Sequence, residues 1–313
     1  MATKMRGKEI MPTELKPAAR PAKSGREREV YGFCDHRRWL TRPVRNGSDH
    51  FGRRAGMEQT PGADVAPNGR CRTRRRLAIG AASEVFQPEA LADQEAGADQ
   101  EVRTSSDFAD VIPLGGGRVA LVLGDVCGKG QVAALYVSQA LNALRLILSE
   151  HTPPARALDR VNRYLCNTEL PVTCLSVALS LAVMDVGTGE VVCACAGSEP
   201  PLILRAGGSM EAVNTGSVSL GVEARRTFQA VDFLLGAGDA LLMATDGVTE
   251  VGRANGSKSK DILCYEGMAR LALDAFSAGG PPGRIARAVL DGAQAFSGGP
   301  LHDDASVLVA IQR

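Results

Sequence analysis

Several features that would assign this chain to a familiar class are missing from it. None of its eight cysteines forms a Cys-x-x-Cys pair, and its four histidines have no ligand-like spacing. No apolar run approaches the roughly 18 residues that a membrane-spanning helix needs, and the charged N-terminus has no apolar signal core. The single tryptophan, Trp39, lies in a basic segment rather than in a candidate core. These absences predict a cytoplasmic protein with reduced, buried thiols and no membrane contact.

A nucleotide-binding loop is also absent. The stretch from Gly124 to Gly130 superficially resembles a phosphate-binding loop, because Lys129 lies among glycines. A P-loop needs four residues between its glycines and a Ser or Thr after the Lys. Here three residues separate Gly124 from Gly128, and Gly130 follows the Lys. The Gly-x-Gly-x-x-Gly fingerprint is missing from this turn as well, which argues against a nucleotide cradle.

Charge is distributed unevenly along the chain. Residues 1–76 contain 19 Lys and Arg against 8 Asp and Glu, whereas the rest of the chain contains 17 against 27. The first segment is also poor in aliphatic residues and follows no helical or strand period, which predicts a largely disordered basic arm. We interpret the arm as a solvated tail or as an over-extended translation start, with Met57 as a later start. An arm that binds nucleic acid is the alternative.

Apolar periodicity places the globular domain at residues 102–313, a length sufficient to bury a substantial core. Residues 77–101 are predicted as a linker that includes a short helix over 77–95. Strand-like and helical runs are segregated along the domain, which favours an α+β fold over a doubly wound parallel sheet. An antiparallel β-sandwich with a helix pair on each face, four layers in the order αββα, fits best. The expected strands are 108–113, 119–123, 173–186, 190–196, 202–204, 228–234, 240–245 and 306–311, and the expected helices are 131–149, 155–167, 264–277 and 282–296.

Four short acidic clusters are the most informative feature of the domain. Three of them lie beside an apolar strand-like run, where the chain turns. Carboxylates at strand ends can converge in the fold although they are distant in sequence. Four converging carboxylates repel each other strongly unless a cation lies between them, and oxygen-only ligation suits the hard ions Mg²⁺ and Mn²⁺. The clusters are residues 106–110, 124–130, 245–247 and 302–306.

Around these clusters the sequence resembles the PPM-type, metal-dependent Ser/Thr protein phosphatases. It is most similar to the bacterial branch that includes the stage II sporulation protein E phosphatase and the sigma-B-regulating phosphatases. One such motif is weak evidence, but these motifs follow the order and spacing of the family over residues 102–313. They are Asp107-Phe108-Ala109-Asp110, Gly124-Asp125-Val126-Cys127-Gly128-Lys129-Gly130, Ala194-Cys195-Ala196-Gly197, Ser219-Leu220-Gly221-Val222, Gly238-Asp239, Thr245-Asp246-Gly247-Val248-Thr249-Glu250 and Asp303-Asp304-Ala305-Ser306.

The resemblance implies a site for two Mn²⁺ or Mg²⁺ ions, which activate a water for in-line attack on a phosphoserine or phosphothreonine. No nucleophilic cysteine is needed, so Cys127 has no assigned role. Lys129 is either a phosphate contact or a surface lysine at a helix start. Asp303 is preferred to Asp304, because the first residue of that pair aligns with the family's ligand. The implied ligands are the carboxylates of Asp107, Asp125, Asp246 and Asp303 and the backbone carbonyl of Val126.

Departures from the family pattern leave two functions open. Ser105 and Ser106 stand where the family usually has two glycines, and Ser198 stands where it has His. All five implied ligands are present, so the resemblance implies an active enzyme that dephosphorylates a signalling protein such as an anti-sigma antagonist. The alternative is a catalytically inactive phosphatase-like domain that binds a partner. Single aspartates favour turns and caps, and Asp110 and Asp239 are assigned such roles.

Overall fold

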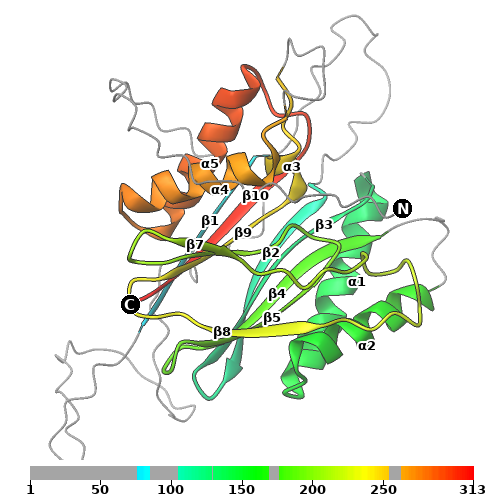
Figure 1. The fold of residues 1–313 in the computed structure, drawn as a ribbon. Coiled ribbons are helices and arrows are strands. Elements are labelled where there is room, and N and C mark those ends of the chain that lie inside the picture. The colour runs from blue at the N-terminus through cyan, green and yellow to red at the C-terminus, as the bar shows by residue number, and fades with distance from the viewer. Residues whose placement is uncertain (1–75, 85–104, 129, 169–175, 254–261) are drawn as a thin grey trace, which may run out of the picture. The chain divides into compact units, whose positions relative to one another are not determined.

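The computed structural model of this chain describes residues 76–84, 105–128, 130–168, 176–253 and 262–313. The predicted basic arm up to residue 75, most of the predicted linker and Lys129 lie outside the described residues. Within the described part, ten strands form two five-stranded antiparallel sheets, and five helices accompany them (Figure 1). This arrangement confirms the predicted α+β sandwich.

The two sheets are each built from antiparallel neighbours. We call the first the β9 sheet, with strand order β1-β10-β9-β6-β7, and the second the β3 sheet, with order β2-β3-β4-β5-β8. The β9 sheet contains β1 (Leu77–Glu84), β6 (Leu202–Leu204), β7 (Met210–Ala212), β9 (Ala240–Ala244) and β10 (Ala305–Gln312). The β3 sheet contains β2 (Asp107–Gly115), β3 (Arg118–Val126), β4 (Val177–Asp185), β5 (Glu190–Ala196) and β8 (Ala230–Leu234). The helices are α1 (Gly130–Ser149), α2 (Pro154–Cys166), α3 (Asp246–Thr249), α4 (Cys264–Ser277) and α5 (Pro282–Ser297).

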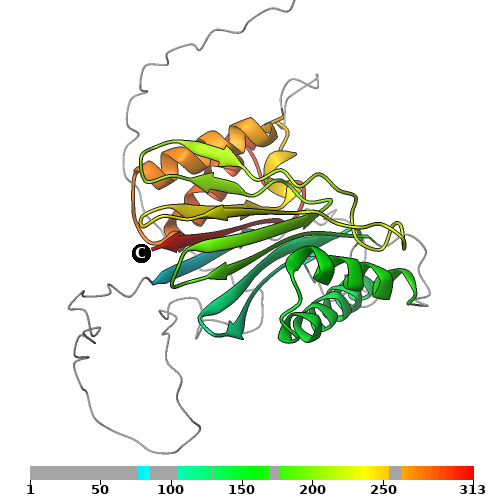
Figure 2. The same cartoon turned by 60° about the horizontal axis from the view of Figure 1, so that its bottom comes forward.

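A pair of helices covers the outer face of each sheet, as Figures 1 and 2 show. Helices α1 and α2 pack on the β3 sheet, and α4 and α5 pack on the β9 sheet. Strand alternation divides the apolar side chains between these layers. In β9, Leu242 belongs to the cluster under α4 and α5, whereas Leu241 and Met243 belong to the cluster between the sheets. Because both faces of the central strands are buried, their sequences are continuously apolar.

The predicted helix over 77–95 is wrong in its described part, residues 77–84, and the rest of the predicted linker lies outside the described residues. Residues from Leu77 onward form β1 instead of a helix, and β1 pairs along its whole length with β10. Gly80 permits close packing of α5 on this strand, because an added Cβ would lie 2.2 Å from the backbone nitrogen of Gly283. The alanines of β1 favour a helix locally, but pairing with the last strand of the chain overrides that propensity. The domain therefore begins before the boundary that periodicity predicts.

Most other predicted elements are confirmed with small shifts at their ends. Two short elements, β7 and α3, were not predicted because three or four residues carry no measurable period. The strand predicted over 173–186 is observed as β4, while residues 169–175 lie outside the described part of the chain. The three glycines from Gly115 to Gly117 all have positive φ, which confirms the tight turn of the β2–β3 hairpin.

Helix α1 corrects one expectation about apolar segments. Over Gln131–Ser149 it is long and apolar enough to cross a membrane by length and composition. Scattered polar residues, such as Asn142 and Arg145, hide this segment from a search for uninterrupted apolar runs. The core helix of a soluble protein passes the same test, so the observation is weak evidence for a membrane span. Here one side of α1 packs in the core, through residues that include Tyr136 and Leu144.

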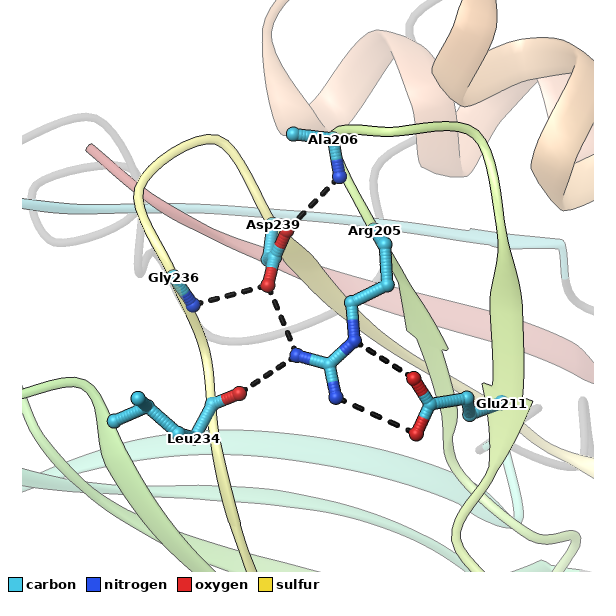
Figure 3. A network of polar contacts seen from close by, with 6 residues as sticks. All are labelled: Arg205, Ala206, Glu211, Leu234, Gly236 and Asp239. Atoms are coloured by element: carbon cyan, nitrogen blue, oxygen red, sulfur yellow. Dashed lines mark hydrogen bonds and ion pairs between the residues drawn. The ribbon is translucent and has the colours of Figure 1, made fainter.

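A polar network joins the two sheets at the N-terminal end of β9 (Figure 3). The carboxylate of Asp239 accepts hydrogen bonds from the backbone of Ala206 (2.9 Å) and Gly236 (3.0 Å) and from Arg205 (2.9 Å). Arg205 also donates to the carbonyl of Leu234, the last residue of β8, over 2.7 Å, and to the carboxylate of Glu211 in β7. Asp239 thus has the predicted turn role, and its hydrogen bonds lower its pKa although burial acts to raise it.

Replacement of Asp239 by Ala is expected to destabilise the protein by about 2–3 kcal/mol, because two backbone N–H groups and one guanidinium lose their acceptor. Urea denaturation of the full chain measures the change. Asp232→Ala is the matched control, since Asp232 is an exposed residue of β8 and its loss is expected to cost less than about 0.5 kcal/mol. Equal denaturation midpoints for the two variants would contradict the role given to this network.

Candidate metal centre

Asp107 and Asp125 lie opposite each other at the open end of the β2–β3 hairpin. They form a direct cross-strand pair, so their side chains leave the sheet on the same face and close together. Asp107 is buried and Asp125 is half-buried. Val126 ends β3, and its N–H donates to the carbonyl of Ser106 over 3.2 Å. The hairpin therefore presents two carboxylates and the backbone of Val126 at one edge of the sheet.

Asp246 and Asp303 lie at the corresponding edge of the β9 sheet. Asp246 is the first residue of α3, directly after β9, and Asp303 lies just before β10. The antiparallel register of these strands, with Ala244 opposite Val307, brings the end of β9 and the start of β10 together. Both carboxylates belong to exposed residues. The two acids are thus neighbours although they are far apart in sequence.

Asp107 is the most buried of the four acids, and its carboxylate accepts a hydrogen bond from a residue next to β9 of the opposite sheet. Burial raises the pKa of Asp107 to about 8, while hydrogen bonds from Ser306 and Thr245 act in the opposite direction. The hydroxyl of Thr245 donates to Asp107 Oδ2 over 2.8 Å and accepts the N–H of Ser306 over 2.9 Å. Thr245 follows β9 and Ser306 belongs to β10, so these bonds tie the start of β2 to the β9 sheet.

The other three carboxylates repel one another. Burial raises the pKa of Asp125, and the charges of Asp246 and Asp303 raise it further. Although Asp246 is exposed as a residue, the loss of water around its carboxylate raises its pKa, and repulsion from Asp303 adds to this effect. Asp107 joins the group through the charge of Asp125. The fold therefore brings the four acids that the sequence singles out into one electrostatic cluster.

Asp304 has a different environment from Asp303. Its Oδ2 accepts hydrogen bonds from the hydroxyl of Ser105 (3.0 Å) and from the N–H (2.8 Å) and hydroxyl (3.1 Å) of Ser106. Asp304 is buried and its charge raises the pKa of Asp107, whereas Asp303 is exposed and raises the pKa of Asp125. This difference supports the choice of Asp303 as the ligand, because the Asp304 carboxylate already has three donors.

The donor chemistry of the cluster fits hard divalent ions. Its side-chain ligands are carboxylate oxygens alone, which suits Mg²⁺ or Mn²⁺, and the mutual repulsion is the kind that a cation relieves. In the described ranges, no three His, Cys, Asp or Glu side chains are placed so that they would hold one ion between them. The four acids interact through their charges in this arrangement, and the fit rests on their chemistry and their common edge.

Two nearby residues have environments that differ from those predicted from the sequence. Asp110 lies within β2 rather than in a turn, and its carboxylate forms an ion pair with Arg145 of α1 at 2.8 Å. The predicted turn role of Asp110 is therefore wrong. Cys127, beside the proposed ligands, is exposed, so the prediction of buried thiols is wrong for this residue and for Cys264, although Cys193 and Cys195 are buried.

A second polar group lies around Ser198, where the family has His. Its hydroxyl shares a hydrogen bond of 2.8 Å with Ser180. The next residue, Glu199, accepts a hydrogen bond of 2.7 Å from Thr249, the last residue of α3. Cys195 also belongs to this group; the hydrogen bond with Cys193 outweighs burial and lowers the pKa of Cys195 to about 6. The serine thus keeps a side-chain hydrogen bond at this position.

Sequence reasoning missed the residues that connect the acids to one another. Thr245, Ser306 and the donors to Asp304 link the start of β2 to β9 and β10. The only signal was indirect, because Thr245, Ser306 and Ser106 lie inside the acidic clusters and Ser105 adjoins one of them. Pairing across two sheets is invisible in a single sequence.

Comparison with known proteins agrees with this fold. The chain resembles the crystal structure of the RsbU and RsbW domains of Rv1364c from Mycobacterium tuberculosis, with 30% identity and a TM-score of 0.58 over 76% of this chain and 60% of that one. It also resembles the catalytic domain of the serine threonine protein phosphatase PstP in complex with two manganese ions, with 16% identity and a TM-score of 0.52 over 76% of this chain and 99% of that one. Two antiparallel sheets between helices thus define the PPM phosphatase fold.

The sequence comparisons are more specific. The profile of the stage II sporulation protein E (SpoIIE) family matches residues 115–312, and the chain therefore belongs to this family of PPM-type phosphatase domains. Protein IcfG of Synechocystis sp. is 27% identical over 172 residues, which cover 47% of this chain and 27% of IcfG. The matched part therefore spans about a quarter of that relative.

Proposed function

We propose that this chain is a metal-dependent phosphatase that hydrolyses phosphoserine or phosphothreonine in a protein. The observation that carries the proposal is the electrostatic cluster of Asp107, Asp125, Asp246 and Asp303, which come from distant parts of the sequence. Membership of the SpoIIE family and the PPM fold support it. Isolated acids favour turns and caps, but four that repel one another at a common edge need a counter-charge.

The proposed roles follow from the positions of the residues. When bound, a pair of Mn²⁺ or Mg²⁺ ions supplies an activated water and clamps the phosphate oxygens. The four carboxylates and the carbonyl of Val126 would hold the ions, and the hydrogen bond from Thr245 orients the carboxylate of Asp107. Lys129 is proposed as a phosphate contact. The N-terminus of α1, which begins at the next residue, favours an anion at the same place.

We further propose that the substrate is a bacterial signalling protein, of the anti-sigma antagonist type. The similarity to the RsbU and RsbW domains of Rv1364c supports a regulatory partner of this kind. Among the described residues five cysteines are free thiols, which fits a reducing compartment and a cytoplasmic location. A nucleic-acid role for the basic arm stays a prediction, and a salt-dependent gel shift that compares the full chain with residues 77–313 tests it.

Metal dependence tests the proposal directly. Full-length protein with Mn²⁺ is expected to hydrolyse p-nitrophenyl phosphate and a phosphothreonine peptide, and EDTA is expected to abolish both activities. Mn²⁺ at about 100 times its Kd is also expected to stabilise the protein against unfolding by about 2.7 kcal/mol for each ion bound. Binding without turnover of either substrate, with Mn²⁺ or Mg²⁺, would instead favour the inactive, partner-binding alternative that the substitutions at Ser105, Ser106 and Ser198 raise.

A further inference from the structure

Three hydrogen bonds to a single oxygen distinguish this chain from the family pattern. Ser105 and Ser106 occupy the two positions where the family usually has glycine, and both donate to Asp304 Oδ2, at 2.8–3.1 Å. A glycine offers only its backbone N–H, so two of the three donors exist because this chain has serines. Asp304 is 7% exposed, and Ser106 is 5% exposed. The bonds therefore lie in a desolvated place, where a charged acceptor makes them strong.

Ser105, Ser106 and Asp304 also contact, or are bonded in the chain to, residues that we propose as metal ligands. The hydroxyl of Ser105 accepts the backbone N–H of Asp107 over 3.1 Å, and the backbone carbonyl of Ser106 accepts the N–H of Val126 over 3.2 Å. Asp304 follows Asp303 directly in the chain, and its side chain anchors the start of β10 to the start of β2. Movement of any one of these residues thus moves a proposed ligand.

We propose that Ser105, Ser106 and Asp304 form a polar latch between the two sheets that positions Asp107, Val126 and Asp303 for metal binding. The inference rests on the proposed function, and it assigns the three residues a positioning role rather than a catalytic one. Asp304 is an acceptor for the serines and not a metal ligand. The serines replace the backbone-only contacts of a Gly-Gly pair with side-chain hydrogen bonds.

The metal requirement of variants tests the positioning role. In Ser105→Ala/Ser106→Ala, the Mn²⁺ concentration for half-maximal activity is expected to rise about 10–100-fold, the usual effect of losing partners that orient ligands. The value of kcat at saturating Mn²⁺ is expected to fall less than about threefold, since all ligands remain. Asp304→Asn keeps an acceptor oxygen and is expected to lie between this variant and the wild type. A loss of turnover in Asp304→Asn as complete as in Asp303→Asn would overturn the inference by making Asp304 a ligand.

Two controls separate positioning from general destabilisation. Asp239→Ala weakens the opposite end of β9 and is expected to leave the Mn²⁺ requirement unchanged. Ser138→Ala removes an exposed serine that bonds only the backbone of its own helix and is expected to change nothing. An Mn²⁺ requirement in the double serine variant equal to that of the wild type would refute the positioning role.

Unfolding in EDTA tests the latch without any metal or substrate. The double serine variant and Asp304→Ala are each expected to lower Tm by about 3–8 °C. The triple variant is expected to lose less stability than the sum of the two losses, because either change removes the hydroxyl bonds to Asp304. Additive losses would refute the latch. A wild type that binds no Mn²⁺ would instead refute the proposed function and the positioning role together, while the coupling in EDTA still reports on the bonds themselves.

Discussion

Replacement of Asp246 by Asn is expected to lower Mn²⁺-dependent hydrolysis of p-nitrophenyl phosphate at least about a thousandfold, on the order of 4 kcal/mol of transition-state stabilisation. The amide keeps the size of the side chain but removes the charge and a ligand oxygen. Initial rates at saturating Mn²⁺ measure the effect. Asp274→Asn, on the exposed side of α4, is the matched control and is expected to retain wild-type activity.

Without metal, Asp246→Asn is expected to be at least as stable as the wild type, although its activity is lost. Burial and repulsion from Asp303 raise the pKa of Asp246, so the charged form is disfavoured in the folded, metal-free protein. A raised carboxyl pKa means that stability is lost as pH rises through the folded-state value, and a neutral amide avoids this loss. In EDTA at pH 8, Asp246→Asn is therefore expected to have a Tm at least as high as the wild type. A lower Tm in EDTA would show that the lost activity reflects misfolding.

Gly247→Ala is expected to have the second large effect, because α3 approaches the start of β10 more closely than any side chain permits. A Cβ at Gly247 would lie 1.9 Å from the carbonyl oxygen of Asp304 and 2.9 Å from its carbonyl carbon. Backbone atoms cannot move aside as a flexible side chain can, so α3 must shift and take Asp246 with it. We expect a loss of about 3 kcal/mol in the free energy of unfolding and a loss of most metal-dependent activity.

The matched control for this substitution is Gly207→Ala in the turn between β6 and β7. A Cβ at Gly207 would meet no atom within 4 Å, so the variant is expected to fold and react as the wild type. Urea denaturation and initial rates at saturating Mn²⁺ measure both proteins. Wild-type stability in Gly247→Ala would mean that α3 is not held against Asp304 as described.

Local patterns predicted the parts of the fold that depend on neighbouring residues. The turn at Gly115–Gly117, the long helix after it and the apolar strands follow from periodicity and from glycine's freedom at positive φ. The short strand β7 carried too few residues to show a period. Leu77–Glu84 was misassigned because its alanines favour a helix, whereas its partner β10 is the last strand of the chain.

The candidate site also combines residues that the sequence identified with a contact that it did not predict. Asp107, Asp125, Asp246 and Asp303 were identified from the order of their motifs, and the structure places them in one electrostatic cluster. Asp110 was assigned to a turn, but an ion pair with an α1 side chain occupies its carboxylate. The partner in that pair is 35 residues away, and no motif marks it.

Sequence alone identified the four acids, because their identities and their places beside strand-like runs can be read from the order of residues. It also determined the α+β layering, since alternation and helical period are local properties. Only the tertiary structure showed that the carboxylate of Asp304 accepts hydrogen bonds from the serines at the start of β2, whereas the preference for Asp303 as a ligand came from the motif alignment. The physical reason is that these hydrogen bonds cross between two sheets whose pairing partners are set by packing and not by nearby sequence.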